Sequence, residues 1–408
     1  MSFLSFCYGH CGNQIGDVLY STIFEDIKND NASLYFNNSL KKWFNVQRNG
    51  KWEARCILVD TENKVIATRK HKIYGFKNVV TGCYGSSENN WAYGYNCQSD
   101  LVLDSILNMV RKENEKRHIT SYMNILSSGG GSGSGVGSKV IEELKNEYPK
   151  KNILNAVILP YLNGDLNTQN YNTILSLAKL HSATDSSVLF ENDKLYYTCS
   201  TKLRNNINFN DLNKVIAFQL ASIFQPLTSE NDTFSINQLT THNLFKYLQL
   251  KSSFPSTQYY KFESSQTWRN KLYPLIKQYE EFKGFKDTLQ LKTKIMMSAV
   301  ITRGKDKPTV KELEWFQSAR NFVNWIPKDY QFSQSHESRH FCGREKTLTI
   351  LTNDNNICNF LNSTIENAWK LFTKKAYLHH YEKHDVSIEE FQSSFQKMED
   401  ILAGYSNL

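Results

Sequence analysis

The chain has 408 residues, 40% of them hydrophobic, which is enough to bury a large core and to form two or three domains. Its 48 basic and 40 acidic residues give a formal charge of +8, too small and too evenly spread for a nucleic-acid-binding surface. No apolar run reaches the roughly 18 residues needed to cross a bilayer, and the amino terminus lacks the basic residues of a secretory signal. We therefore expect no nucleic acid and no membrane among the partners.

The eight cysteines are scattered without paired spacing, which is typical of reduced thiols in the cytosol or nucleus. Cys7, His10 and Cys11 lie close together in the sequence and suggest a metal cluster. A tetrahedral site needs four converging ligands, and no second cysteine pair follows downstream. We therefore interpret these residues as part of a strand end and not as a metal site.

The first half of the chain alternates β-rich runs with helix-period patterns. Strands are predicted at 3–8, 55–59, 122–126, 154–159 and 188–190, and helices at 13–27, 138–148 and 171–183. Strand and helix repeated in this way predict an α/β fold with a doubly wound parallel sheet covered on both faces. Ligands of such sheets bind at the carboxyl edge of the strands.

The second half begins with a helix predicted at 211–224, which is apolar around most of its circumference and therefore buried between domains. Strands at 289–302 and 347–351, a helix at 310–319, and terminal helices at 365–381 and 387–405 follow. Ser387 and Glu390 form a capping-box pattern at the start of the last helix. We predict three pieces, with bounds 1–208, 209–354 and 355–408.

The most informative stretch is the glycine-rich run 129–137, GGGSGSGVG, between a predicted strand and a predicted helix. A glycine loop in this position lets several backbone N–H groups approach a polyphosphate, and the following helix adds its positive amino end. The run therefore predicts an anion site for a nucleotide.

Three other interpretations of this run fit less well. A flexible Gly/Ser linker would not be bracketed so closely by ordered elements. A Walker loop requires Gly-Lys-Ser/Thr, whereas Lys139 follows Ser138 here. The dinucleotide pattern G-x-G-x-x-G is not found in any register of the run.

Two motifs in the chain resemble those of the tubulin superfamily. The run 129–137 resembles the tubulin signature loop GGGTGSG, and GHCGNQIG at 9–16 resembles the amino-terminal motif GQCGNQIG. Further segments, NNWAYGY at 89–95, END at 191–193, RGKD at 303–306, KAYLHHY at 375–381 and YSNL at 405–408, resemble the delta-tubulins more than the alpha, beta or gamma types. The resemblance extends along the whole chain and weakens only around 229–289.

The resemblance implies a tubulin-like fold: a GTP-binding domain at 1–208, a central buried helix with an α+β intermediate domain at 209–354, and a C-terminal helical region at 355–408 without the acidic tail of alpha- and beta-tubulin. It also implies the residues that bind GTP or GDP and Mg²⁺. Phosphate contacts are expected from Gly9, His10, Asn89, Gly130, Gly131, Ser132, Gly133 and Ser134, and magnesium contacts from Asp60 and Glu62. Base and ribose contacts are expected from Cys11, Gln14, Asp165, Gln169, Asn192, Phe209 and Asn213.

Three positions depart from the family pattern in ways that bear on chemistry. Glu88 replaces a glycine beside the γ-phosphate loop, where a negative charge repels a triphosphate unless a cation intervenes. His10 replaces a glutamine and supplies positive charge there only when protonated. Lys246, in the segment 240–246, is placed where alpha-tubulin carries the acidic residue that orients water at a neighbour's nucleotide. We therefore expect GTP binding with weak hydrolysis at most, and no catalytic residue is assigned.

The resemblance implies a GTP-dependent cytoskeletal protein that supports the triplet microtubules of centrioles and basal bodies and hence cilia. The partners are then alpha-, beta- and epsilon-type tubulins and centriolar proteins, in the cytoplasm, with the nucleus left open. A second interpretation is a monomeric regulatory GTP-binding protein that does not polymerise. A third, a metabolic enzyme with a nucleotide cofactor, is disfavoured because neither a dinucleotide fingerprint nor a Ser-His-Asp or paired-carboxylate site is found.

Overall fold

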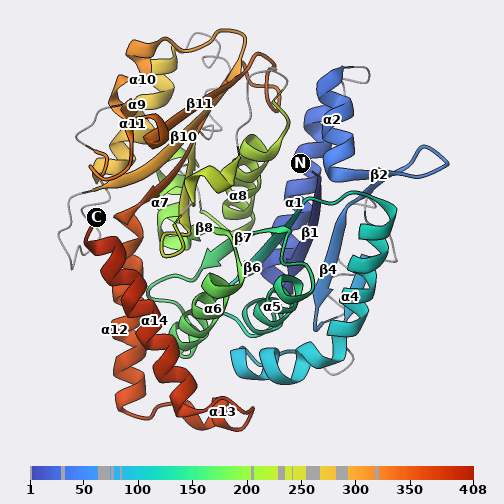
Figure 1. Cartoon of the computed structure of the whole chain (residues 1–408), viewed down its shortest axis with the longest axis vertical. Helices are drawn as coiled ribbons and strands as arrows, with labels where there is room; N and C mark the ends of the chain where they lie inside the picture. Colours follow the sequence, from blue (N-terminus) through green and yellow to red (C-terminus); the bar gives the residue numbers. More distant parts are fainter. Residues whose placement is uncertain are drawn as a thin grey trace.

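A single ten-stranded sheet crosses the part of the chain that the structure describes (Figure 1). The structure is a computed structural model, and it describes residues 2–28, 33–62, 74, 78–82, 85–203, 206–227, 235–240, 242–253, 267–281, 293–317 and 321–408. The strand order is β11-β10-β12-β9-β8-β7-β6-β1-β4-β5. Two short strands, β2 (Phe44–Val46) and β3 (Trp52–Ala54), form a separate hairpin.

The first six strands of the large sheet are parallel and form a nucleotide-binding type of topology. They are β1 (Phe3–Tyr8), β4 (Cys56–Asp60), β5 (Val79–Thr81), β6 (Ser121–Ser127), β7 (Asn152–Leu159) and β8 (Ser186–Glu191). Chain order runs outward from β1 to β5, then returns to the other side of β1 and continues to β8. The order therefore reverses between β1 and β6, and such a switch point opens a crevice at the carboxyl ends of the two strands.

The remaining strands extend the same sheet with mixed directions. They are β9 (Tyr247–Ser252), β10 (Ile295–Gly304), β11 (Phe332–Glu337) and β12 (Lys346–Asp354). The β9 strand pairs in parallel with β8, while β12 pairs antiparallel with both β9 and β10. The predicted boundary at residue 208 thus falls between two strands that are hydrogen-bonded to each other, and the division into three domains stays a prediction.

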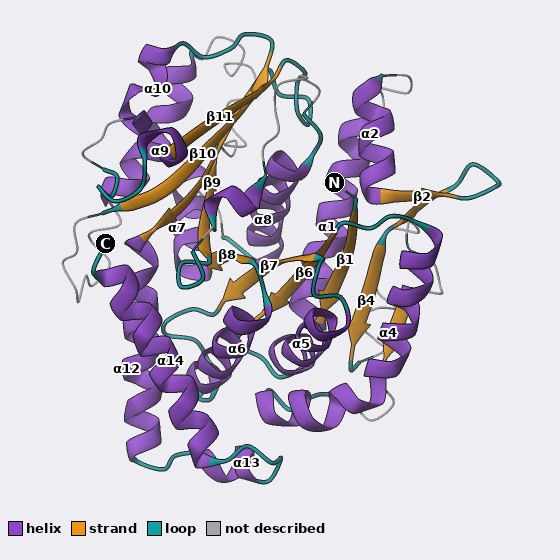
Figure 2. Cartoon of the chain, viewed as in Figure 1, coloured by secondary structure: helices purple, strands orange, loops and turns teal. Residues whose placement is uncertain are grey.

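Helices flank both faces of the sheet (Figure 2). The longer ones are α1 (Gly9–Ile27), α2 (Leu34–Trp43), α4 (Ser99–Lys116), α5 (Gly137–Glu147), α6 (Gln169–Ala183), α7 (Asn192–Leu203), α8 (Phe209–Phe224), α9 (Trp268–Glu281), α10 (Val310–Gln317), α12 (Cys358–Thr373) and α14 (Ile388–Ser406). The shorter ones are η2 (Tyr93–Gln98), η3 (Ser132–Val136), η4 (Ile236–Leu239), α11 (Lys328–Gln331), η7 (Asn355–Ile357) and α13 (Leu378–Glu382). In this arrangement α1 packs on α8, and α6 packs on the C-terminal pair α12 and α14.

The predicted α/β fold is confirmed, and most predicted elements differ from the observed ones only at their ends. The first helix begins at Gly9 and not at residue 13. The helix predicted at 365–381 is wrong as a single element, because α12 ends at Thr373 and α13 starts at Leu378, with Lys375 and Tyr377 at φ 51° and 61° between them. Ser387 caps α14 as predicted, since its hydroxyl accepts from the Glu390 N–H. Residues 289–292 and 318–319 of two predicted elements lie outside the described residues.

The buried helix α8 ends in a joint built from charged side chains. Arg303, at the end of β10, is only 1% exposed. Its guanidinium donates to three backbone carbonyls, those of Ser222 (2.9 Å), Gln225 (2.7 Å) and Pro226 (3.1 Å). The last carbonyls of a helix have no partner within the helix. Arg303 therefore fastens the carboxyl end of α8 to the second half of the sheet.

A buried carboxylate, Asp26 at the end of α1, completes this joint. It accepts hydrogen bonds from the Tyr35 hydroxyl (2.7 Å), the Gln225 amide (3.1 Å) and the Cys342 backbone N–H (2.8 Å). Arg339 adds an ion pair at 3.1 Å. Because these partners come from α2, from the end of α8 and from the segment between β11 and β12, Asp26 links the first and second halves of the chain.

Candidate nucleotide site

The chain turns sharply from β1 into α1 at Gly9, whose φ is +66°. A Cβ atom at this position would lie 2.8 Å from the backbone nitrogen of Gly133, so only glycine fits. One turn later Asn13, 4% exposed, donates from its amide nitrogen to the carbonyls of Gly9 (2.8 Å) and Val59 (3.0 Å). The Asn13 side-chain oxygen is buried and has no protein partner. A buried acceptor of this kind calls for a donor from water or a ligand.

The glycine-rich run follows β6 and enters α5 through the π-helical turn η3. It packs tightly on the segment after β5, because a Cβ atom at Gly131 would lie 2.6 Å from the Ser87 carbonyl oxygen. Gly130 is different. A Cβ atom there would meet only Asn89 Oδ1, at 3.9 Å. The loop thus leaves an opening, defined as the space that one added carbon atom would take between Gly130 and Asn89. It lies at the amino end of the helical segment formed by η3 and α5, where an anion is favoured.

The hydroxyl groups of the loop bond mainly within the protein. Ser132 Oγ lies 2.7 Å from Thr61 Oγ1 and donates to Ser87 Oγ at 2.9 Å. The Ser134 hydroxyl, fully buried, donates to the Gly130 carbonyl. These bonds fix the shape of the loop, so its backbone N–H groups remain the main donors for a phosphate.

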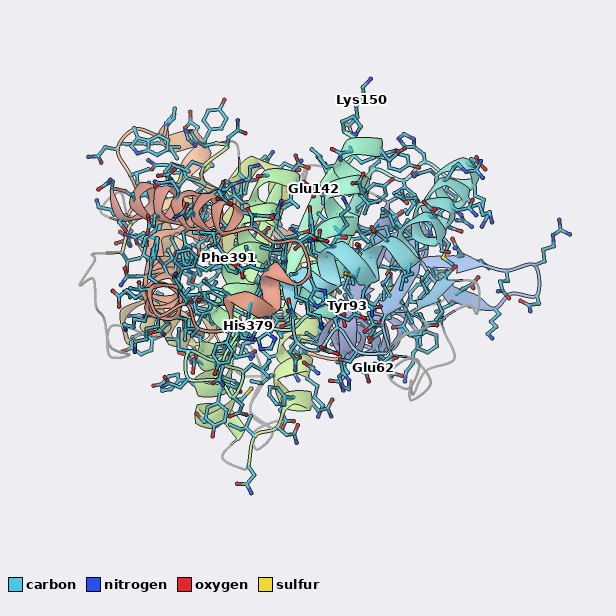
Figure 3. The ribbon with its side chains drawn as sticks, turned by 90° about the horizontal axis from the view of Figure 1, so that it is seen from below. Glu62, Tyr93, Glu142, Lys150, His379 and Phe391 are labelled. Atoms are coloured by element: carbon cyan, nitrogen blue, oxygen red, sulfur yellow. The ribbon has the colours of Figure 1, made fainter. Side chains whose placement is uncertain are left out.

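The two carboxylates after β4 differ in their surroundings. Asp60 is 4% exposed, and burial raises its pKa, although hydrogen bonds from the Glu62 backbone N–H (3.3 Å) and the Asn13 amide (3.3 Å) oppose this. Glu62 is exposed at the surface in Figure 3. Asp60 therefore helps to fix the Asn13 side chain by accepting its hydrogen bond, whereas Glu62 is the carboxylate that a cation can reach.

A second group of predicted residues lies where α1 meets the start of α8. The Gln14 amide nitrogen lies 2.6 Å from His10 Nε2. On its other side Gln14 accepts from the Asn213 amide (3.4 Å). Cys11 lies beside them, and burial raises the pKa of its thiol to about 12, which keeps it protonated at neutral pH. The two amides and the thiol carry no charge, as suits contact with a base.

Aromatic rings complete this second group. Phe209 opens α8 and is 63% exposed, with its ring centre 6.2 Å from that of Tyr161. Gln169, buried at the start of α6, donates to the Tyr161 carbonyl (2.7 Å) and so helps to fix the backbone that carries the ring. Asp165 is exposed, and Asn192 is half-buried at the first position of α7. An exposed ring beside amides offers a stacking surface for a base.

All the predicted site residues follow the carboxyl ends of β1, β4, β6, β7 and β8, or lie on the segment after β5 or the first turns of α8. Sequence reasoning missed Thr61, Ser87, Tyr161 and Asn172. Asn172 makes the most side-chain hydrogen bonds of the four. In the sequence it could be noticed only as a polar residue on the buried face of a helix. The other three lie directly beside motif residues.

Comparisons with known proteins agree with this geometry. The profile of the tubulin/FtsZ family GTPase domain matches residues 2–200. The chain is 31% identical to the tubulin delta chain of Homo sapiens and 31% identical to that of Macaca fascicularis, with each alignment covering 100% of both chains. It is 26% identical to the tubulin beta chain of Saccharomyces cerevisiae over 97% of this chain and 90% of the relative. The chain belongs to the tubulin family.

Membership of the tubulin family makes this a GTP-binding cytoskeletal protein, and its nucleotide edge fits that ligand. The opening at Gly130 has space for a phosphate, and the unpartnered Asn13 oxygen can accept from a polar donor. The exposed Phe209 ring offers a stacking surface for a base. Within the described ranges, no three His, Cys, Asp or Glu side chains are grouped to hold a metal ion. A magnesium ion at Glu62 would therefore take most of its oxygen ligands from phosphates and water, as Mg²⁺ commonly does. No helix among the described residues is both long enough and apolar enough to span a bilayer.

Lys246, in the segment that resembles the tubulin loop at a neighbour's nucleotide, has hydrogen-bond partners within its own chain. Thr241 lies outside the described residues. The Lys246 ammonium donates to the carbonyls of His181 (3.0 Å) and Thr184 (2.9 Å), at the carboxyl end of α6. A cation in this position satisfies orphan carbonyls and the helix dipole. These bonds lie within one chain, so the prediction that Lys246 replaces the acidic residue at a neighbour's nucleotide stays a prediction.

Proposed function

We propose that this chain binds GTP or GDP together with Mg²⁺ at the carboxyl edge of β1, β4, β6, β7 and β8. The observation that carries the proposal is the opening between Gly130 and Asn89, in a loop whose neighbouring glycine packs without spare space. Backbone N–H groups of the loop bind the phosphates. Glu62 holds the cation through water, and Asp60 accepts a hydrogen bond from the Glu62 backbone N–H. Asn213 and Asn192 read the guanine edge, because an amide both donates and accepts, and Phe209 stacks on the base.

The binding test is direct. The chain, purified without added nucleotide and then denatured, releases close to one guanine nucleotide per chain, which chromatography identifies. The ratio of GTP to GDP reports on hydrolysis. Absence of guanine nucleotide, even after incubation with GTP and magnesium, contradicts the proposal.

Gly130→Ala separates binding from folding. Its added methyl group meets no protein atom closer than 3.9 Å, so thermal unfolding without nucleotide stays as in the wild type. The methyl group occupies phosphate space, so the rise in melting temperature on adding GTP is lost or sharply reduced. An undiminished rise would exclude Gly130 from the binding surface.

We further propose that the chain works with alpha-, beta- and epsilon-type tubulins and with centriolar proteins to build or maintain the triplet microtubules of centrioles and basal bodies, and hence cilia. Its similarity to tubulin delta chains along their full length supports this role. Depletion in a ciliated cell is expected to leave centrioles with doublets or singlets in electron micrographs. Normal triplets, together with failure to sediment with alpha- and beta-tubulin, would instead indicate a regulatory GTP-binding protein that does not polymerise.

A further inference from the structure

A fully buried amide, Asn172 of α6, connects three separate parts of the chain. Its nitrogen donates to the carbonyls of Asn89 (2.8 Å) and Gly129 (2.9 Å). Its oxygen accepts from the Trp91 backbone N–H (3.0 Å) and the Tyr381 hydroxyl (2.6 Å). An amide side chain has two donor and two acceptor positions, and all of them are used. Asn172 thus ties the glycine-rich loop, the segment 88–91 and the C-terminal helix α13 together.

The segment that Asn172 holds is locally unfavourable. Glu88 and Asn89 have φ values of 50° and 53°, in the left-handed region that non-glycine residues rarely adopt. Such conformations persist when the surroundings fix them, and here the Asn89 carbonyl accepts from both Asn172 and Thr168 (3.4 Å). The backbone of Asn89 is therefore set by the network behind it, while its exposed side chain faces the opening at Gly130.

The segment 88–91 and the helical turn η2 that follows it are bound to the tip of the C-terminal helices, residues 374–385, which contain α13. The Asn90 amide donates to the His380 carbonyl (2.8 Å), and the Asn96 amide donates to the His384 carbonyl (2.7 Å). The ring of Tyr93 lies on that of His384, with centres 4.7 Å apart. Figure 3 shows α13, with His379, beside Tyr93 on the face of the molecule that also bears Glu62. The tip therefore borders the phosphate side of the site.

We propose that Tyr381 and Asn172 are positioning residues that hold Asn89 toward the terminal phosphate of a bound nucleotide, so that docking of the tip favours GTP over GDP. This inference rests on the proposed nucleotide site. Because coupling between two sites is reciprocal, a bound γ-phosphate in turn holds the tip more firmly against Asn90 and Tyr93. The tip, which is more than a hundred residues away from the phosphate loops in the sequence, is then held more firmly when GTP is bound than when GDP is bound.

A purely structural role for the network makes a different prediction. If Asn172 and Tyr381 only stabilise the fold, loss of their bond weakens GTP and GDP binding equally. If they position Asn89, the loss falls on GTP, since GDP lacks the terminal phosphate toward which Asn89 is proposed to be held. The preference for GTP over GDP therefore separates the two roles, whereas stability alone does not.

The decisive variant is Tyr381→Phe, which removes one hydroxyl and keeps the ring packed on Tyr171 and Phe391. Tyr171→Phe is the matched control: Tyr171 is equally buried and binds the same tip through the Ala376 carbonyl (3.2 Å), but the structure shows no bond from it to Asn172. Dissociation constants for GTP and GDP are measured by calorimetry in the presence of magnesium. Tyr381→Phe is expected to weaken GTP about five- to tenfold and GDP less than twofold, and Tyr171→Phe is expected to change neither by more than twofold.

A second measurement uses the wild type and needs no variant. Hydrogen exchange of the amides in 374–385 is expected to be slower with GTP bound than with GDP bound. Equal exchange, or equal losses of GTP and GDP affinity in Tyr381→Phe, overturns the positioning role and leaves the nucleotide site standing. A wild type that binds neither nucleotide overturns the site itself, and the inference with it.

Discussion

The two ends of α8 have contrasting surroundings. At its carboxyl end every group is enclosed: Arg303 binds three carbonyls, and Gln225 accepts from Ser39 (2.8 Å) and Trp43 (3.1 Å) while it donates to Asp26. At its amino end the helix is held by its own capping box, and Phe209 stands 63% exposed. One end is a fixed joint between the halves of the chain, and the other is open to a ligand.

This difference shows how one buried helix serves both stability and binding. A charge such as that of Arg303 is tolerated inside a protein only when its hydrogen bonds are made, so the joint is specific and costly to disturb. The amino end satisfies its first N–H groups through Asn208 and Asp211, which are exposed or partly exposed, and needs no partner from elsewhere in the fold. Its side chains are therefore free to serve a nucleotide.

The largest expected effect is at the joint. Arg303→Ala leaves three buried carbonyls without donors and is expected to lower the free energy of unfolding by about 3 kcal/mol, measured by urea denaturation. Arg303→Lys keeps the charge but not the planar fork, so about half of that loss is expected. Losses below about 1 kcal/mol for both variants would show that the carboxyl end of α8 is not a structural joint.

A smaller effect, and of a different kind, is expected at the open end. Phe209→Ala is expected to change the free energy of unfolding by less than about 0.5 kcal/mol, because the ring is exposed. It is expected to weaken guanine-nucleotide binding about tenfold, the typical contribution of a stacked aromatic ring. Tyr330→Ala, which removes a 72% exposed ring on α11, is the control and should alter neither quantity. A large loss of stability in Phe209→Ala would contradict the division between the two ends.

The smallest effect is a pH dependence at the joint. Lys42 lies over the Phe3 ring, with the ammonium 5.0 Å from the ring centre, and burial together with the positive charge of Arg303 lowers the pKa of Lys42 to about 7. In the unfolded chain this pKa is 10.5, so between about pH 7 and 10.5 the unfolded state binds more protons and stability rises with pH. A shift of that size would correspond to about 5 kcal/mol for a group without contact to water. Because the Lys42 side chain is only half-buried and water screens its charge, the rise is expected to stay below about 1 kcal/mol.

The contribution of Lys42 is measured as the difference in unfolding free energy between the wild type and Lys42→Met across that pH range. Lys41→Met, at the exposed neighbouring position, corrects for the loss of one surface charge. If the difference in unfolding free energy does not change with pH, the Lys42 ammonium is exposed to water and its pKa is not lowered by folding.

The sequence predicted the elements whose signal is local. Residues 3–8 are apolar except for Ser5 and form the fully buried strand β1, and the glycine-rich run lies between a strand and a helix as expected. The start of α1 was placed too late, because glycines at 9 and 12 suggest a loop, whereas Gly9 supplies the positive φ that lets the helix begin there. The break before α13 has no glycine or proline to announce it, since Lys375 and Tyr377 adopt the left-handed conformation themselves.

The interactions that the sequence did not predict are those between distant segments. The pairing of β8 with β9 depends on strands some sixty residues apart, and β9 was not predicted at all. Asn172 looks like a single polar residue in a helix until Tyr381 is brought against it. Lys246 was aligned with a neighbour-facing position, but the end of α6 lies within reach and offers it two carbonyls. Such partners become visible only in the folded chain.

The pairing of β8 with β9 also has a consequence for synthesis and for recombinant fragments. A chain ending at residue 208 contains the first six parallel strands of the sheet but leaves β8, buried along almost its entire length, as a bare edge strand. An uncovered apolar edge recruits other strands and leads to aggregation. Until Tyr247–Ser252 has emerged from the ribosome and paired, β8 of the nascent protein is therefore open to pairing with other chains, and an isolated amino-terminal fragment is expected to need β9 or a substitute for it to remain in solution.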